Sequence, residues 1–313
     1  MRNDYIPLVF CFDNKFAPYA AVAIYSYHLS AISPLKIYCL VSSLDQTNTN
    51  ILKALRQKFG IDIVVIGVVD DPFSGWKEVN HITRAAYLRL LIPDAIPEDR
   101  VIYLDCDTFG LGDLRQLYET PLNGAFIGGV CDEFGAKTSR MPFHPDNQYI
   151  NSGVLLMDLA GLRRDYFFDQ CREIYFMHSE GVTWADQCVI NKYAEQRKII
   201  LQSYWNRQVY PNQLQYADVD LLTQGSEVAI IHFIGAVKPW MEWCNPKVLK
   251  LWQSYVDRTA LPDIHSMKLS STDHALSLVS VLDLNRDFEQ SGLIKNQIID
   301  SLMRALELNQ SKA

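Results

Sequence analysis

The segment that indicates the fold is RVIYLDCDTFG, residues 100–110. Its apolar run at 101–104 predicts a buried strand, and two carboxylates, Asp105 and Asp107, follow one residue apart. Like charges this close repel each other unless something positive lies between them. A hard divalent cation such as Mg²⁺ or Mn²⁺ would remove the repulsion, because these ions prefer oxygen ligands. A solvated turn at the strand end explains the same two residues, so the pair alone does not identify a metal site.

Short apolar runs alternate with helical patterns around this strand. Strands are predicted at 8–12, 36–42, 62–69 and 101–104, and helices at 18–30, 44–59 and 83–92. This alternation predicts an α/β fold with a mostly parallel central sheet and helices on both faces. Such sheets bind ligands beyond the carboxyl ends of their strands, which is where the two aspartates fall.

The second half of the chain has a more mixed pattern. Strands are predicted at 125–131, 150–159 and 227–235, and helices at 161–179 and 186–195. From about residue 246 the pattern is helical to the end, so we expect a main domain over 1–260 and a helical extension over 261–313. An apolar stripe in the extension recurs every four residues and is expected to pack on the main domain, with a dimer or membrane-surface contact as the alternative. The stripe consists of Ile294, Ile298, Leu302 and Leu306.

Composition limits the class of protein. The 313 residues are 49% hydrophobic and 21% charged, as in a globular protein large enough to need no disulfides. The net charge of −7, without a basic run, argues against a nucleic-acid partner. Seven scattered cysteines without a CxxC predict a reducing compartment, most simply the cytoplasm. We expect neither a secretory signal nor a membrane-spanning segment.

A second candidate site lies in IIHFIGAVKPW, residues 230–240. His232 belongs to an apolar strand, Gly235 would let backbone approach a phosphate, and Lys238 supplies positive charge. A histidine in such a strand is also commonly a satisfied core residue. Imidazole with two carboxylates suits Mn²⁺, so this segment and the aspartates together predict a metal–diphosphate site.

Three further segments contain candidate site residues. Asn151 lies in INSGVLLMDL at the mouth of a strand, Asp186 and Gln187 lie in WADQCVIN at the start of a helix, and Arg89 lies in HITRAAYLRL. Structural alternatives exist for each: a β-bulge or turn, a helix N-cap, and a solvated helix face.

The order and spacing of these five segments resemble the family 8 glycosyltransferases, which are retaining enzymes with a GT-A type nucleotide-sugar fold. The resemblance covers roughly residues 6–260 and is greatest to bacterial members that add galactose or glucose to lipopolysaccharide core oligosaccharide. It implies a GT-A catalytic domain over 1–260, a UDP-galactose or UDP-glucose donor, Mn²⁺ or Mg²⁺, and a saccharide acceptor.

The resemblance leaves several alternatives open. The acceptor is lipopolysaccharide core, or else capsule, a protein glycan or a self-glucosylating primer. A catalytically inactive nucleotide-binding scaffold is a further alternative, although it would not need the full set of metal and phosphate residues. Peripheral association with the cytoplasmic face of the inner membrane and a homodimer through the C-terminal helices are also implied. Residues 265–313, with five Lys/Arg and six Asp/Glu, match anionic lipid poorly.

The resemblance also implies a role for each candidate residue. The metal ligands are Asp105, Asp107 and His232. Residues that contact the donor are Cys11, Asp13, Phe16, Arg89, Asp105, Cys106, Gly235 and Lys238. Catalytic residues around the transferred sugar are Gln187, Asp186 and Asn151. Two positions depart from the family pattern: Lys15 replaces a smaller polar residue, and Met241 stands where related members often have histidine.

The implied reaction is metal-assisted. The cation bridges the UDP phosphates, and Lys238 adds a second positive charge there. Retention normally indicates a carboxylate nucleophile, but the matching residue is Gln187, an amide. The resemblance therefore favours same-face attack, in which the leaving phosphate accepts the proton of the acceptor hydroxyl. Asp186 is expected to position sugar hydroxyls, and the side chain of Cys106 to point into the core. A two-carboxylate glycosidase is disfavoured, because no second acid pairs with the two aspartates for that purpose.

Overall fold

The computed structural model describes residues 4–69, 71–79, 83–224 and 228–310, with backbone only at 224 and 306–310. They form two compact units, which we describe separately. Unit 1 comprises Met1–Arg207 and Ser226–His232, and unit 2 comprises Gln208–Gly225 and Phe233–Ala313. The domain boundary that the sequence predicts after residue 260 stays a prediction.

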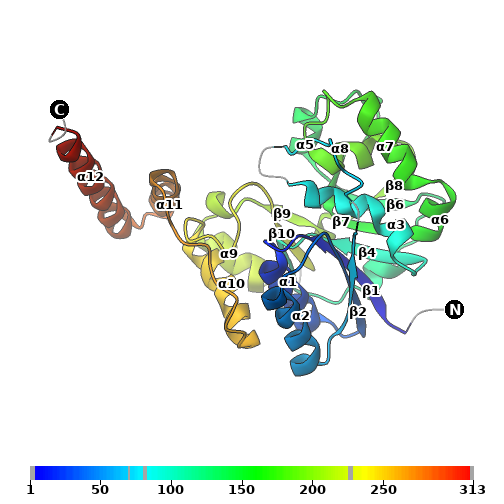
Figure 1. The fold of residues 1–313 in the computed structure, drawn as a ribbon, viewed down its shortest axis with the longest axis horizontal. Coiled ribbons are helices and arrows are strands. Elements are labelled where there is room, and N and C mark those ends of the chain that lie inside the picture. Colours follow the sequence, from blue (N-terminus) through cyan, green and yellow to red (C-terminus); the bar gives the residue numbers. More distant parts are fainter. Residues whose placement is uncertain (1–3, 70, 80–82, 225–227, 311–313) are drawn as a thin grey trace. The chain divides into compact units, whose positions relative to one another are not determined.

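Unit 1 is built on a seven-stranded sheet with the order β3-β2-β1-β4-β7-β6-β8 (Figure 1). β1 pairs in parallel with β2 and β4, β2 with β3, and β6 with β8, whereas β7 runs antiparallel to β4 and β6. The predicted α/β class with a mainly parallel sheet is therefore confirmed. The strands are β1 Ile6–Phe12, β2 Leu35–Val41, β3 Asp62–Gly67, β4 Arg100–Leu104, β6 Ile127–Cys131, β7 Ile150–Asp158 and β8 Lys198–Ile200.

Helices cover both faces of this sheet. α1 (Ala17–Ser30) and α2 (Gln46–Phe59) connect β1 to β2 and β2 to β3, and successive right-handed crossovers in one direction place both on the same face. The chain then returns past β1 to β4, so the 3₁₀-helix η1 (Arg84–Leu91) and α3 (Ile92–Ala95) lie on the opposite face, as α3 shows in Figure 1. Consistent with this, Phe10 packs on Tyr27 of α1 with ring centroids 6.0 Å apart.

The helix predicted over 83–92 is for the most part the 3₁₀-helix η1. Residue 83 precedes η1, and residue 92 begins α3. In a 3₁₀-helix the side chains at i and i+3 lie in line. Arg89 Nε accordingly donates to the carbonyl of Ala86 at 2.9 Å, and Ile92 N donates to the carbonyl of Arg89. The tighter winding directs the buried guanidinium inward, a tertiary effect that helix periodicity does not show.

The helix predicted over 161–179 is two helices. α6 (Leu159–Arg164) and α7 (Phe167–Met177) are separated at Tyr166, whose φ of 51° is left-handed and cannot continue a right-handed helix. α8 (Ala185–Tyr193) matches the helix predicted over 186–195 within two residues. Unit 1 also contains short elements without a clear sequence signal: β5 Thr108–Gly110, α4 Arg115–Glu119, α5 Glu133–Thr138 and η2 Ser203–Trp205.

β5 joins the two predicted metal segments. It follows the aspartates directly and pairs antiparallel with β10 (Ile230–Phe233), so that His232 lies opposite Thr108. β10 is shorter than the strand predicted over 227–235, whose first residue lies outside the described part of the chain. This pairing places His232 beside the carboxyl end of β4.

Unit 2 is mainly helical. α11 (Thr272–Leu284) and α12 (Phe288–Gln310) are joined by an ion pair between Asp283 and Lys295, 2.9 Å apart. Of the predicted apolar stripe, Ile294 and Ile298 are half-buried, Leu302 is exposed, and the side chain of Leu306 lies outside the description, so its packing on the main domain stays a prediction. Within the described residues, no helix combines the length and apolar character needed to span a bilayer. The elements are β9 Arg207–Val209, η3 Pro211–Gln213, α9 Tyr216–Gln224, α10 Pro246–Thr259, α11 Thr272–Leu284 and α12 Phe288–Gln310, with Arg207 of β9 in unit 1.

Candidate active site

Three side chains that could hold a metal ion, here called the metal triad, meet in unit 1: Asp105 and Asp107 follow β4, and His232 lies in β10. One ligand atom from each of Asp105, Asp107 and His232 lies within 4.8 Å of the others. His232 Nε2 is 3.2 Å from Asp107 Oδ1 and 3.8 Å from Asp105 Oδ2. The structure therefore brings together the three predicted ligands, and an imidazole with two carboxylates fits Mn²⁺ or Mg²⁺.

Gly153 of β7 makes room for two of these side chains, those of His232 and Asp105. A Cβ at this position would lie 2.2 Å from His232 Cε1 and 2.7 Å from Asp105 Oδ2. The Gly153 carbonyl also accepts a hydrogen bond from Asp105 N at 2.8 Å. Only glycine allows a backbone to approach this closely. The glycine of INSG is thus a steric requirement of the metal triad.

The protein engages one oxygen of Asp105. Its Oδ1 accepts a hydrogen bond from the Tyr103 hydroxyl at 2.5 Å and lies 3.0 Å from Arg89 Nη2. The guanidinium of Arg89 in turn lies 4.6 Å from the Tyr103 ring centroid, a cation–π contact. The other oxygen, Oδ2, is the one that faces His232, so Asp105 is oriented to offer that oxygen to a cation.

Arg89 connects the metal triad to the predicted sugar site. It is 6% exposed, its Nε is 3.1 Å from Asp186 Oδ2, and its Nη1 donates to the Ser152 carbonyl at 2.8 Å. Burial alone would lower the pKa of Arg89, but the carboxylates of Asp105 and Asp186 outweigh it and the pKa rises. Burial raises the pKa of Asp186 to about 6, although Arg89 opposes that rise. The guanidinium is therefore a fixed positive charge between two carboxyl groups.

Side-chain amides and a carboxylate line the neighbouring sugar site. Gln187 Oε1 accepts from Ser152 N at 2.9 Å, and Gln187 Nε2 donates to Asp132 Oδ2 at 3.0 Å. Asn151 Nδ2 donates to Gln187 Oε1 at 3.2 Å and, more weakly, to Asp132 Oδ2 at 3.4 Å. The predicted residues Asn151, Asp186 and Gln187 thus lie together.

The sequence reasoning missed two polar residues of this site. Asp132 follows β6 and caps α5 by accepting from Gly135 N at 2.7 Å; a carboxylate after a strand was a signal that could have identified it. Asn206 lies between η2 and β9, where no local pattern marks it. Its Oδ1 is 3.1 Å from His232 Nδ1, and its Nδ2 donates to Asn151 Oδ1 at 3.0 Å.

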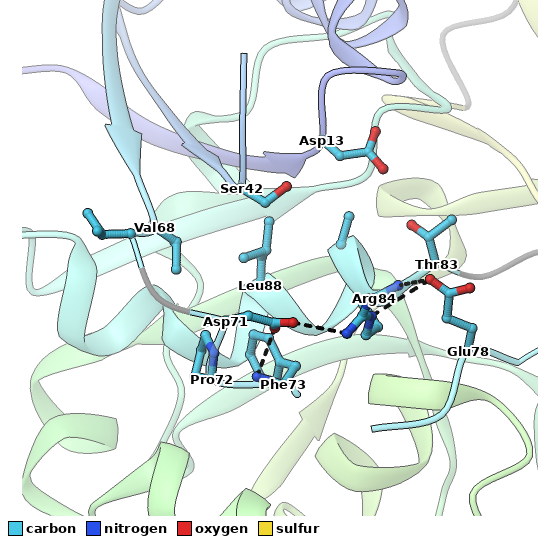
Figure 2. Close-up of a pocket in the computed structure, with 12 residues that line it drawn as sticks. Asp13, Ser42, Val68, Asp71, Pro72, Phe73, Glu78, Thr83, Arg84 and Leu88 are labelled. Carbon is cyan, nitrogen blue, oxygen red and sulfur yellow. Dashed lines mark hydrogen bonds and ion pairs between the residues drawn. The ribbon is translucent and has the colours of Figure 1, made fainter. Parts of the chain in front are cut away.

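A cavity of about 320 Å³ opens beyond the carboxyl ends of β1, β2 and β3 (Figure 2). Asp13 and Ser42 line it just after β1 and β2. Three carboxylates, those of Asp13, Asp71 and Glu78, line it with one guanidinium, Arg84. Arg84 lies 2.9 Å from Asp71 and 3.9 Å from Glu78, as Figure 2 shows. The net acidic lining suits groups that donate hydrogen bonds better than it suits phosphates.

Three further predicted donor residues, Cys11, Phe16 and Cys106, belong to unit 1. Cys11 and Cys106 are both buried, and the Cys106 thiol lies 3.9 Å from the Cys11 carbonyl. Burial raises the pKa of both thiols. Phe16 is half-buried and its ring packs edge-on against Tyr19. Contacts of these residues with a nucleotide stay predictions.

Gly235 and Lys238 belong to unit 2. Gly235 has a φ of 85°, a left-handed conformation that glycine adopts readily. Lys238 Nζ donates to the Phe233 carbonyl at 3.1 Å. Their approach to a diphosphate stays a prediction.

A comparison with known protein families and sequences finds relatives of this chain. The model of glycosyl transferase family 8 matches residues 7–244. General stress protein A of Bacillus subtilis (strain 168) is 27% identical over 255 residues, which cover 77% of this chain and 89% of that protein. Lipopolysaccharide 1,2-glucosyltransferase of Escherichia coli (strain K12) is 26% identical over 193 residues, 58% of this chain and 56% of that protein. Glycosyltransferase GlyF of Streptococcus pneumoniae serotype 4 is 28% identical over 185 residues, 59% of this chain and 45% of that protein. The chain thus spans only about half the length of the last two relatives.

Solved structures show the fold. Galactosyltransferase LgtC in complex with donor and acceptor sugar analogs matches with a TM-score of 0.70 and 23% identity, over 87% of this chain and 100% of that chain. An active-site mutant of LgtC matches with a TM-score of 0.71 and 24% identity, over 82% and 98%. The predicted GT-A fold is therefore confirmed.

Gly153→Ala should disable the metal triad. The added Cβ would displace His232 and Asp105, so we expect the affinity for Mn²⁺ to fall about tenfold or more. The electron paramagnetic resonance signal of free Mn²⁺ during titration measures this. Gly67→Ala is the matched control, because a Cβ there meets no atom within 4 Å. Wild-type Mn²⁺ affinity in Gly153→Ala would contradict the steric argument.

Asp186 should make stability depend on pH. Its pKa is about 6 in the fold, against an ordinary value of 3.8. A carboxyl whose pKa is raised by folding stabilises the fold fully below its unfolded pKa, and this contribution is lost as the pH rises through about 6. The free energy of unfolding of the wild type, relative to Asp186→Asn, should therefore fall by about 2 kcal/mol between about pH 4 and about pH 6.5. Urea denaturation in metal-free buffer measures the difference, and a constant difference would exclude the shift.

Proposed function

Because this chain belongs to glycosyl transferase family 8, we propose that it transfers a hexose, galactose or glucose, from a UDP-sugar to a saccharide acceptor with retention of configuration. The observation that supports this best is that one buried guanidinium, Arg89, pairs with both a metal-triad carboxylate and a sugar-site carboxylate. The acceptor we favour is lipopolysaccharide core oligosaccharide, since one relative is named as a lipopolysaccharide glucosyltransferase.

The nucleoside of the donor would occupy the cavity beyond β1–β3. The carboxylate of Asp13 can accept a hydrogen bond from the base or the ribose, and the acidic lining repels phosphate. β4 is the neighbour of β1 in the sheet, so the diphosphate can extend from the cavity toward the aspartates that follow β4. This order of nucleoside, then diphosphate, then sugar agrees with the order of strands at the carboxyl edge.

Asp105, Asp107 and His232 would hold Mn²⁺ or Mg²⁺, and a cation bound there neutralises negative charge on the departing diphosphate. The protein's own contribution is orientation. Tyr103 and Arg89 hold Asp105 with one oxygen toward His232. Lys238 would add positive charge at the diphosphate.

The sugar site favours same-face attack over a covalent intermediate. Gln187 is an amide whose Oε1 already accepts hydrogen bonds from Ser152 N and Asn151 Nδ2, which weakens an already feeble nucleophile. Asp186 is 2% exposed and paired with Arg89, an arrangement for fixing sugar hydroxyls rather than for attack. The leaving phosphate oxygen would then accept the proton of the acceptor hydroxyl.

An aromatic pair beside Gln187 would bind the acceptor. Phe134 is 53% exposed, and its ring lies 5.7 Å from the half-buried ring of Trp184. Both residues adjoin the sugar site: a Cβ on Gly135 would lie 2.9 Å from Gln187 Nε2. The C–H face of a pyranose is apolar and stacks on such rings.

With this acceptor the enzyme would work at the cytoplasmic face of the inner membrane. Peripheral membrane association and a homodimer through the C-terminal helices stay predictions.

Mn²⁺-dependent hydrolysis of UDP-sugars should require the triad. Asp107→Asn removes one ligand charge, so we expect UDP-galactose and UDP-glucose turnover to fall about 100-fold or more while melting temperature is kept. Asp62→Asn, exposed at the start of β3, is the matched control. Near-normal turnover of Asp107→Asn with added Mn²⁺ would refute the metal assignment. A wild type that neither hydrolyses a UDP-sugar nor binds UDP by calorimetry would indicate the scaffold alternative.

Phe134→Ala should weaken acceptor binding without affecting the donor. Loss of one stacked ring is worth about 1.4 kcal/mol, so the KM for a core oligosaccharide that supports transfer should rise about tenfold. Acceptor-free hydrolysis of the UDP-sugar should stay at the wild-type rate. Phe176→Ala is the control, because Phe176 is 60% exposed on α7 and packs on Tyr175 and Trp76. An unchanged acceptor KM would remove Phe134 from the acceptor site.

A further inference from the structure

A single hydrogen-bonded chain runs from the metal triad to the far side of the sugar site. Its members, here called the amide chain, are His232, Asn206, Asn151, Gln187 and Asp132. We propose that Asn206 and Asp132 are positioning residues, which hold His232 in the tautomer that presents a free Nε2 lone pair to the metal. The inference rests on the proposed metal site and goes beyond it, because neither residue is a metal ligand.

Backbone N–H groups determine how the two central amides are oriented. Gly153 N donates to Asn151 Oδ1 at 2.9 Å, and Ser152 N donates to Gln187 Oε1 at 2.9 Å. A backbone N–H is only a donor, so neither amide can be rotated by 180° without placing two donors against each other. The Nδ2 of Asn151 and the Nε2 of Gln187 must therefore point the other way, toward Asp132.

The orientation of Asn151 in turn determines that of Asn206 and of the imidazole. Since Asn151 presents Oδ1, the neighbouring atom of Asn206 must be its Nδ2 donor, at 3.0 Å. Asn206 Oδ1 then faces His232 Nδ1 at 3.1 Å. A carbonyl oxygen accepts only, so Nδ1 carries the proton and Nε2 keeps its lone pair. Nε2 is the nitrogen beside Asp107 and Asp105.

Asp132 is the acceptor at the other end of the chain. Its Oδ1 accepts from Gly135 N at 2.7 Å and its Oδ2 from Gln187 and Asn151. Asp132 is 9% exposed, so the protein encloses most of it. An asparagine in its place would turn an NH₂ group against either Gly135 N or the two amides. The carboxylate is thus the one group that accepts on both sides.

The consequence is that the metal triad and the sugar site share one set of hydrogen bonds. All five residues are buried, where a misdirected amide leaves unsatisfied donors at a cost of about 1–3 kcal/mol. Partners that hold a metal-ligating histidine through its second nitrogen typically change metal affinity 10–100-fold when removed. Asn206 contacts His232 directly, and Asp132 acts through Asn206 by way of Asn151, which it contacts both directly and through Gln187.

The test measures Mn²⁺ affinity by electron paramagnetic resonance without nucleotide. Asn206→Leu keeps the volume and removes both hydrogen bonds, so the affinity should fall about 10–100-fold. Asn206→Asp keeps an acceptor for Nδ1–H, so its Mn²⁺ affinity should stay within about threefold of wild type while UDP-sugar turnover falls. Asn245→Asp, a buried amide-to-carboxylate change at the N-cap of α10, is the matched control.

Asp132→Asn and the double variant Asn206→Leu/Asp132→Asn distinguish the amide chain from simple charge loss. If Asp132 acts through the chain, Asp132→Asn weakens Mn²⁺ binding alone but has no further effect once Asn206→Leu has broken the connection. If it acts only as a distant negative charge, the two losses add, which overturns the proposal for Asp132. Unchanged Mn²⁺ affinity in a folded Asn206→Leu overturns the proposal for Asn206 and leaves the proposed function standing. Absence of Mn²⁺ binding by the wild type overturns both.

Discussion

The buried guanidinium of Arg89 is the charge on which the rest of the site depends. Asp105 and Asp186 both pair with it, and Asp186 lies in the interior, where an unpaired carboxylate is costly. Asp107 adds a third carboxylate beside His232 Nε2, so one guanidinium does not balance the carboxylates, and a divalent cation would reduce the excess negative charge. The raised pKa of Asp186 is the sign that Arg89 alone does not offset burial there. The same arrangement explains why the predicted metal ligands and sugar residues form one site.

The sheet order brings these residues together from distant parts of the sequence. β4 lies between β1 and β7, so the aspartates after β4, Asn151 at the start of β7 and the cavity after β1 share one region. β5 then adds His232 through its pairing with β10. Polar residues placed after apolar strands could be predicted from sequence, because strand burial and polarity are local patterns. The aspartate pair, His232, Asn151 and the α/β class were accessible for this reason.

Other features depend on tertiary structure and had no local signal. Asn206 follows a short 3₁₀ turn, and only its neighbours Asn151 and His232 give it a role. η1 winds as a 3₁₀-helix with Arg89 directed toward two carboxylates, and the helix periodicity of the segment predicts neither feature. Ala185 has a left-handed φ of 45°, which is uncommon for a residue other than glycine. It lies between Trp184 and Asp186 at the start of α8. Backbone strain of this kind appears only in three dimensions.

The amide chain also limits which residues could contact the hexose that we propose is transferred. Asn151 has four hydrogen-bonding positions, and all are occupied by Gly153 N, Asn206, Gln187 and Asp132. It therefore acts on the sugar through its neighbours. Gln187 uses both lone pairs of Oε1, donates from Nε2 to Asp132 and also hydrogen-bonds to Tyr149, whereas the contacts of Asp186 with Arg89 and Ser152 involve Oδ2 alone. The two hexoses differ in one hydroxyl configuration, and an oriented acceptor such as Asp186 can discriminate at that position because the wrong epimer leaves a buried group unpaired.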